Sequence, residues 1–307
     1  MKTCIVLSSI PDYLRPMLES DITVIRSLSE KGKILRILRN ICFKLKFLSI
    51  DHWINKDLYS VHDYDNVIFF ANKYTLRVLK YLLKKYPEKN YIIWHWNPVT
   101  KEVDPRIYPN KDNISICSFD PNDAKKFNIK YIESFSVINI ERISQYELQN
   151  VIADTDIYFI GQDKGRINKI KYCKNLFKSL ELRYNIKVIR DKTSKNNPTS
   201  DYSPRQSYEE VINDIRKAKA VLEILQPNQT GFSQRVFEGI VYNKKIITDN
   251  VAIESTKLYT PNRVFILGKD DVNKLREFIY NPLPEIAGDV LEYYSFHGWL
   301  KRITSIQ

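Results

Sequence analysis

A short turn in the middle of the chain carries residue types that bind phosphate. The apolar run at residues 157–160 is followed by Gly161, Asp163, Lys164, Gly165 and Arg166. Glycine allows a tight turn, and the two cations stand where the N–H groups of a following helix would begin. Backbone N–H groups, a helix dipole and fixed positive charges together favour a diphosphate. The alternative is that Lys164 and Arg166 only solvate a surface turn.

A second glycine-containing segment leads into a predicted helix. The loop contains Gln229, Thr230 and Gly231, and the helix contains Arg235 and Glu238. Residues three apart share one face of a helix, so the arginine and the glutamate lie on the same face. A carboxylate there can accept hydrogen bonds from both hydroxyls of a ribose. The alternative is a surface ion pair that contributes about a few tenths of a kcal/mol.

The elements that would position these residues alternate between strands and helices, which predicts an α/β fold with parallel sheets. With 307 residues, the chain is long enough for two lobes, which we expect at residues 1–150 and 151–307. Ser207 and Glu210 have the spacing of a helix-opening capping box, and a final helix is expected from residue 289. Apolar runs typical of buried strands lie at residues 4–8, 66–70, 91–94, 114–117, 157–160, 187–189, 221–225, 245–248 and 264–267.

Ligands of open α/β sheets bind beyond the carboxyl ends of the strands. In the first lobe these predicted ends hold Ser8, Ser9, Asn72, Trp94, His95, Trp96, Asn97 and Asp120. In the second lobe they hold the turn at 161–166, Glu223, the loop at 229–231 and residues 248–250.

Two Asp-x-Asp pairs have the spacing of a divalent-cation site, Asp63 with Asp65 and Asp154 with Asp156. Both pairs precede predicted strands, at the opposite edge of the sheet, so we interpret them as turn residues. The four histidines include no pair three or four residues apart, and the four cysteines include no C-x-x-C pair. The sequence therefore predicts no metal site and no disulfide scaffold, as in a reducing compartment.

A basic segment near the N-terminus has the pattern of an amphipathic helix. Apolar residues spaced by three and four predict one stripe, and the segment's cations would flank it. This combination is typical of a helix on an anionic membrane surface. The alternative is a helix packed on the core with a solvated basic face. The segment spans residues 31–48, with cations at Lys31, Lys33, Arg36, Arg39, Lys44 and Lys46 and the stripe at Leu35, Leu38, Cys42, Leu45 and Leu48.

The overall composition is that of a globular protein, with 43% hydrophobic and 27% charged residues. A net charge of +12 and 20 tyrosines permit nucleic-acid binding. Because the chain shows no recognised nucleic-acid motif, we expect no nucleic-acid partner. No run of 18 apolar residues exists, and the first residues lack the features of a signal peptide. We therefore expect a cytoplasmic protein, peripheral at the inner face of the membrane if the basic helix binds there.

The order of these segments resembles bacterial glycosyltransferases of the GT-B type, which build surface polysaccharides such as lipopolysaccharide and capsule. Residues 94–98 look like the family's aromatic-Trp-Asn-Pro segment, and residues 118–124 look like its Ser-Phe-Asp-x-x-Asp-Ala stretch. Residues 161–166 are similar to its Gly-x-Asp-Lys-Gly-Arg turn, and residues 229–250 are similar to its donor-side segment. The resemblance implies two facing Rossmann-like lobes, with a nucleotide-sugar in the C-terminal lobe and an acceptor in the N-terminal lobe.

The chain departs from this family in one respect. Retaining enzymes of this type often carry two glutamates separated by seven residues. Thr230 stands at the position eight before Glu238, so that pair is absent.

The resemblance implies transfer of a sugar from a nucleotide-diphosphate donor to a hydroxyl of a growing, glycan or lipid-linked, bacterial surface acceptor. We expect no metal and no cofactor, with Lys164, Arg166 and Arg235 stabilising the leaving diphosphate. The other expected donor contacts are Gly161, Asp163, Gln229, Thr230, Gly231 and Glu238.

An inverting transfer also needs a base beside the acceptor oxygen. Asp12 is the first candidate, followed by Asp120 and His95, and the acceptor-side residues are Ser9, Trp96 and Asn97. Two rival interpretations stay open at this point. One is a nucleotide-sugar-binding protein without catalysis, and the less favoured one is a basic nucleic-acid-binding protein.

Overall fold

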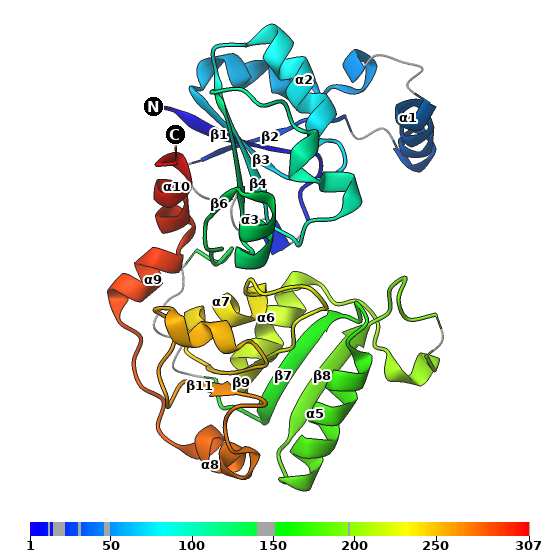
Figure 1. The fold of residues 1–307 in the computed structure, drawn as a ribbon. Coiled ribbons are helices and arrows are strands. Elements are labelled where there is room, and N and C mark those ends of the chain that lie inside the picture. Colours follow the sequence, from blue (N-terminus) through cyan, green and yellow to red (C-terminus); the bar gives the residue numbers. More distant parts are fainter. Residues whose placement is uncertain are drawn as a thin grey trace. The chain divides into compact units, whose positions relative to one another are not determined.

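The structure, a computed structural model, forms two compact units (Figure 1). Met1–Glu133 and Leu300–Gln307 make the N-terminal unit, and Ser134–Trp299 make the C-terminal unit. The lobe boundary predicted near residue 150 lies outside the described residues. These are residues 1–11, 13–14, 22–29, 32–45, 50–139, 151–195 and 197–306.

The N-terminal unit contains a parallel sheet of six strands in the order β2-β1-β3-β4-β5-β6. The strand runs predicted at residues 4–8, 66–70, 91–94 and 114–117 are confirmed as β1, β3, β4 and β5. The elements are β1 (Thr3–Leu7), β2 (Thr23–Arg26), α1 (Gly32–Leu45), β3 (Asn66–Phe70), α2 (Thr75–Lys85), β4 (Asn90–His95), β5 (Ile114–Ser118), α3 (Pro121–Phe127) and β6 (Lys130–Tyr131).

The C-terminal unit contains a parallel sheet of five strands in the order β11-β10-β9-β7-β8. The capping box of Ser207 and Glu210 is confirmed at the start of α6. The predicted final helix is two helices, because Ser295 interrupts it with an extended backbone. The elements are β7 (Thr155–Gln162), α5 (Ile167–Ser179), β8 (Tyr184–Ile189), α6 (Tyr208–Arg216), β9 (Ala218–Glu223), α7 (Gln234–Val241), β10 (Lys245–Thr248), β11 (Val264–Ile266), α8 (Leu275–Tyr280), α9 (Gly288–Tyr294) and α10 (Phe296–Thr304).

Alternate residues of β9 face helices on the two sides of its sheet. Ala220 and Leu222 share a buried cluster with apolar residues of α5 and α8, including Ile170. Val221 faces the opposite side, where a Cβ added at Gly239 of α7 would meet Val221 Cγ2 at 2.5 Å. Glycine therefore lets α7 lie close against β9, which brings the N-terminus of α7 to the carboxyl edge of the sheet.

The order of the C-terminal sheet reverses between β7 and β9. The chain leaves β7 for β8 on one side and then returns to β9 on the other side. Open α/β sheets bind ligands at such a reversal, beyond the carboxyl ends of the two central strands. The N-terminal sheet reverses in the same way between β1 and β3.

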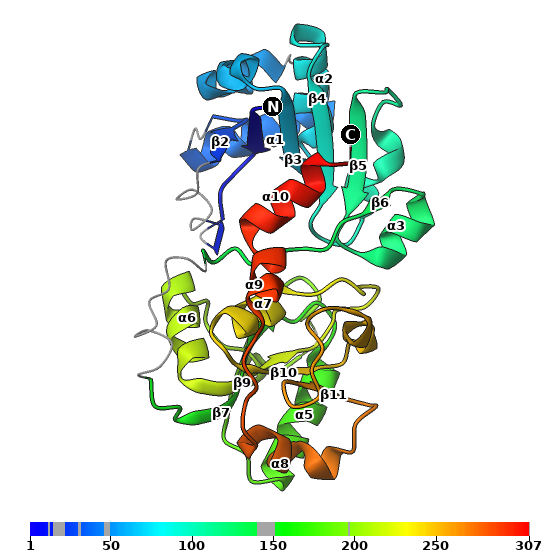
Figure 2. The ribbon, with the colours of Figure 1, turned by 90° about the vertical axis from the view of Figure 1, so that its left-hand side faces the viewer.

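The last residues of the chain belong to the N-terminal unit, where the C-terminus lies near β5 and β6 (Figure 2). Arg302 donates a hydrogen bond to the carbonyl oxygen of Glu133, and Lys130 of β6 donates one to that of Ile306. The sequence analysis assigned these residues to the second lobe, since nothing local in the sequence signals the return.

Helix α1 matches the predicted basic amphipathic segment only in part. Leu35 and Leu38 of the predicted stripe are exposed, whereas Cys42 is half-buried against the core. Arg39, one of the cations predicted to flank the stripe, is buried. Leu48 lies outside the described residues.

Candidate functional site

Asp163 fixes the turn that follows β7. Its side chain is fully buried and accepts hydrogen bonds from Ser194 Oγ (2.9 Å), Tyr202 OH (2.6 Å) and the backbone N–H groups of Gly165 and Ile167 (both 3.1 Å). Burial opposes ionisation, but the bonds from Tyr202, Ser194 and Ile167 outweigh it and hold the pKa of Asp163 below its usual value. Asp163 is therefore a charged anchor for the turn.

Lys164 and Gly165 turn the chain through the left-handed region, with φ values of 46° and 78°. The backbone N–H of Lys164 donates to Asp191 Oδ2 at 2.9 Å, which fixes this conformation. Within the described ranges, no residue forms a hydrogen bond or an ion pair with the Lys164 ammonium group. Burial and the neighbouring Arg166 lower the pKa of Lys164. The turn thus holds a half-buried cation that lacks a paired carboxylate.

Arg166 lies where the sheet order reverses. Its guanidinium donates to the carbonyl oxygen of Gln162 at the end of β7 and to that of Ile224 just after β9. A Cβ added at Gly161 would lie 2.5 Å from Arg166 Nη2, so glycine is required for this approach. Burial lowers the pKa of Arg166, against the opposing effect of Glu223 and other carboxylates. The guanidinium joins the two central strands beside Lys164.

Glu223, the last residue of β9, ties the start of α7 to the sheet. Its buried carboxylate accepts hydrogen bonds from the backbone N–H of Ser233 (2.6 Å) and from Thr248 Oγ1 (2.7 Å). Burial raises the pKa of Glu223. The sequence analysis placed Glu223 at a strand end but gave it no role; a carboxylate at the last position of a buried strand was the signal.

The loop that follows β9 lies against the turn that follows β7. A Cβ added at Gly165 would lie 3.9 Å from Pro227 Cγ. Asn250 Nδ2 donates to the carbonyl oxygen of Thr230 at 2.9 Å, and Gln229 Nε2 donates to that of Gly231 at 2.7 Å. The structure therefore brings the predicted residues 229–231 to the same edge as Lys164 and Arg166.

Arg235 and Glu238 form a buried ion pair on α7. Arg235 Nη2 lies 2.8 Å from Glu238 Oε1 and 2.6 Å from Glu238 Oε2, and Tyr208 OH on α6 donates to Oε1 at 3.0 Å. Glu238 is 1% exposed, and burial raises its pKa against the opposing effect of Arg235 and Tyr208. The contact with Tyr208 was not foreseen, because it joins residues 30 positions apart.

The first turn of α7 gathers buried polar atoms that lack a hydrogen-bond partner. Ser233 is the N-cap residue, yet its side chain makes no capping bond. Buried polar atoms are normally paired, so each such group calls for a ligand, an ion or water. Among the described residues, the unpaired atoms of this turn are Gln234 Oε1 and Arg235 Nη1.

The candidate bases of the N-terminal unit lie at the carboxyl edge of its sheet. His95 ends β4 and is 1% exposed, and burial lowers its pKa to about 4, so it is neutral at pH 7. Asp120 follows β5, and its Oδ1 caps α3 by accepting from the N–H groups of Asn122 (3.0 Å) and Asp123 (3.2 Å). The Asp-Pro sequence already signalled this cap. Asp12 lies outside the described residues.

The predicted acceptor-side residues share this edge. Trp96 Nε1 donates to the carbonyl oxygen of Ala71 at 3.2 Å, and its ring stacks on Tyr13 with centroids 6.0 Å apart. Asn97 and Ser9 are exposed. Ser9 follows β1, and Trp96 and Asn97 follow β4; only β3 separates these two parallel strands, so their loops leave the same edge of the sheet.

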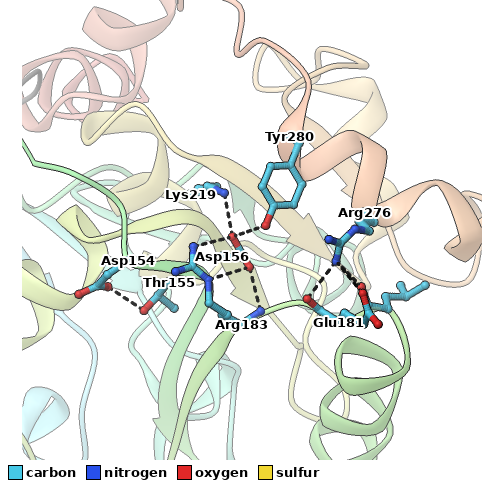
Figure 3. A network of polar contacts seen from close by, with 9 residues as sticks. Asp154, Thr155, Asp156, Glu181, Arg183, Lys219, Arg276 and Tyr280 are labelled. Atoms are coloured by element: carbon cyan, nitrogen blue, oxygen red, sulfur yellow. Dashed lines mark hydrogen bonds and ion pairs between the residues drawn. The ribbon is translucent and has the colours of Figure 1, made fainter.

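The sequence analysis interpreted Asp154 and Asp156 as turn residues. The structure differs at Asp156, whose contacts are drawn in Figure 3. Asp156 is not in a turn but within β7, because that strand begins at Thr155. Its fully buried carboxylate contacts Lys219 Nζ (2.9 Å), Arg183 and Tyr280 OH (3.1 Å). These oxygens are neutralised within the protein at the amino edge of the sheet. In the part of the chain that the structure describes, no group of three or more His, Cys, Asp or Glu side chains could hold a metal ion.

Solved structures with the same fold include glycosyltransferases. AviGT4, a glycosyltransferase involved in avilamycin A biosynthesis, is 13% identical, with a TM-score of 0.58 over 99% of this chain and 96% of that chain. The fold of this chain is the GT-B fold.

Two further structures agree with this assignment. Sucrose-phosphate synthase from Thermosynechococcus elongatus is 9% identical, with a TM-score of 0.57 over 100% of this chain and 98% of that chain. Anabaena HepE, solved in complex with UDP and glucose, is 11% identical, with a TM-score of 0.51 over 99% of this chain and 98% of that chain. No protein-family model and no curated protein matches the sequence. At these identities the likeness establishes the fold.

Proposed function

We propose that this protein transfers a sugar from a nucleoside-diphosphate donor, bound by the C-terminal unit, to an acceptor hydroxyl. The observation that carries the proposal is the Lys164 ammonium, half-buried without a paired carboxylate, beside Arg166 at the reversal of the sheet. Anabaena HepE, which shares the fold, was solved with UDP, and this supports a diphosphate donor.

The charge of the site suits departure of a diphosphate. Negative charge grows on the leaving group in the transition state, and fixed cations in a partly desolvated site stabilise it. Lys164 and Arg166 lie at the carboxyl end of β7, and the N-terminus of α7 adds the positive end of a helix dipole. Arg235 Nη1 has a free donor in that first turn. These groups take the part that a divalent cation plays in other transferases, so the proposed reaction is independent of metal.

The acceptor would bind at the carboxyl edge of the N-terminal unit, where Ser9, Trp96 and Asn97 lie. A hydroxyl of a glycan or a lipid-linked sugar of the bacterial surface is the acceptor class that we propose. Asp120 is committed to the cap of α3, and the low pKa of His95 makes it a weak base. These two observations leave Asp12 as the first candidate for the base.

The same two observations also favour a second candidate function, a nucleotide-sugar-binding protein without catalysis. A transferase and a non-catalytic binding protein would both bind the donor. Only a transferase would release free nucleoside diphosphate from it.

Replacement of Lys164 tests the proposed donor site. We expect Lys164→Gln to weaken UDP binding about tenfold or more, since a hydrogen bond to a charged group contributes about 1.5–3 kcal/mol. The melting temperature should not fall, because the lost ammonium pairs with no described residue. The matched control is Lys178→Gln, which replaces an exposed lysine in the last turn of α5. Equal calorimetric affinities of the two variants for UDP and the other nucleoside diphosphates would contradict this donor site.

A further inference from the structure

Helix α1 exposes aliphatic side chains and buries a cation. Ile34 is 75% exposed, Ile37 53%, Leu38 46% and Ile41 47%. Their spacing by three and four residues places them on one face of the helix. Arg39, in contrast, is 8% exposed. This distribution is the reverse of that of a helix that packs on a core with its apolar stripe.

The opposite face of α1 holds the helix on the N-terminal unit. The ring of Phe43 lies against Trp53 and Tyr74, with centroids 6.5 and 5.9 Å away. The Arg39 guanidinium lies 5.0 Å from the centre of the Tyr74 ring, and Arg77 donates a hydrogen bond to the carbonyl oxygen of Phe43. These contacts fix which face of α1 points outward, at the margin of this unit (Figure 1, dark blue).

The surrounding sequence is strongly basic. Residues 31–50 contain six lysines and arginines and no aspartate or glutamate. A second copy of this chain would bring the same positive charge against it, so self-association through α1 is disfavoured. An anionic surface complements the charge, and an acyl-chain layer complements the aliphatic face.

We propose that α1 lies in the interface of an anionic lipid bilayer, with Ile34, Ile37, Leu38 and Ile41 inserted toward the acyl chains. The 14-residue helix is about 21 Å long, too short to cross a bilayer but suited to lie in its surface. Among the described residues, no helix is long and apolar enough to cross a membrane. The membrane would thus hold the protein where a lipid-linked acceptor is found.

Flotation with vesicles tests this proposal without a donor or acceptor, so its outcome is independent of the proposed function. The wild-type protein should bind vesicles of phosphatidylglycerol and phosphatidylcholine, more weakly at high salt and on pure phosphatidylcholine. The double variant Ile34→Ser/Ile41→Ser should reduce partitioning at least tenfold. Because both side chains are exposed, its circular dichroism spectrum and melting temperature should match those of the wild type.

The control replaces two exposed isoleucines elsewhere in the described chain. Ile107→Ser/Ile152→Ser, at positions 40% and 92% exposed, should bind vesicles like the wild type. Equal partitioning of the two double variants would overturn the proposal. Absence of vesicle binding would also overturn the proposal. A dimer formed through α1, seen by sedimentation velocity, or an acidic protein bound there would then take the place of the membrane.

Discussion

The residues of the proposed donor site differ in how many hydrogen bonds their side chains already make within the protein. The carboxylates of Asp163 and Glu223 accept hydrogen bonds from the surrounding backbone and side chains, so they position the loops. Lys164 lacks such contacts with its ammonium among the described residues. We therefore assign direct diphosphate contact to Lys164 before any of the other predicted residues.

Glu238 is the residue whose assigned role most needs a test. Its Oε1 already accepts from Tyr208 and Arg235, while its buried Oε2 contacts Arg235 Nη2 at 2.6 Å. If that second oxygen accepts from a ribose hydroxyl, Glu238→Gln should lower the affinity for UDP about tenfold, because an amide makes a weaker bond than a carboxylate. The folded structure should persist.

Calorimetry on the folded variant separates this role from a purely structural one. The control is Glu210→Gln, because glutamine preserves the capping box of α6. This variant should change neither the affinity for UDP nor the melting temperature. A Glu238→Gln protein with a lower melting temperature and unchanged UDP affinity would refute the ribose contact.

At the scale of elements, the sequence predicts what local patterns encode. The buried strands were found because their apolar runs are continuous, as in β3, all five of whose residues are buried. Strand β2 was missed because Thr23–Arg26 is only four residues long and buries a single residue. The contact of α6 with α7 through Tyr208 and Glu238 is tertiary, so no local pattern announces it.

The start of β10 gives an element-scale prediction. Lys245 is 3% exposed and donates to the carbonyl oxygens of Phe278 and Asn281 around α8. Burial lowers its pKa to about 8, whereas an unfolded lysine titrates near pH 10.4. Between these values the unfolded state binds more protons, so this group adds stability as pH rises, by at most about 1.4 kcal/mol per pH unit.

Comparison with Lys245→Met isolates this contribution. Between pH 8 and pH 10 the wild-type protein should gain free energy of unfolding relative to the variant, as measured by urea denaturation at each pH. Below pH 8 the difference between the two proteins should be constant. Parallel stability curves across the whole range would show that Lys245 titrates normally.

At the scale of the whole molecule, both units carry polar and charged side chains on the loops at the carboxyl edges of their parallel sheets. Lys164, Arg166 and the unpaired Nη1 of Arg235 lie on the C-terminal unit, and the exposed Ser9 and Asn97 lie on the N-terminal unit. The resemblance of the chain's motifs to GT-B enzymes implied a donor side and an acceptor side, and that assignment stays a prediction. The sequence did not predict the return of residues 300–307 to the first unit, which depends on long-range contacts.

The most direct test of sugar transfer is the release of nucleoside diphosphate from a panel of nucleotide-sugars by the purified protein in the presence of chelator. Such a site transfers the sugar slowly to water as a side reaction. The assay therefore requires no knowledge of the acceptor. We predict release from at least one nucleotide-sugar by the wild-type protein, reduced at least tenfold in Lys164→Gln and unchanged in Lys178→Gln. Binding of a nucleotide-sugar without release would support a non-catalytic binding protein. Release that is equal in the two variants, or that chelator abolishes, would contradict the metal-independent donor site described above.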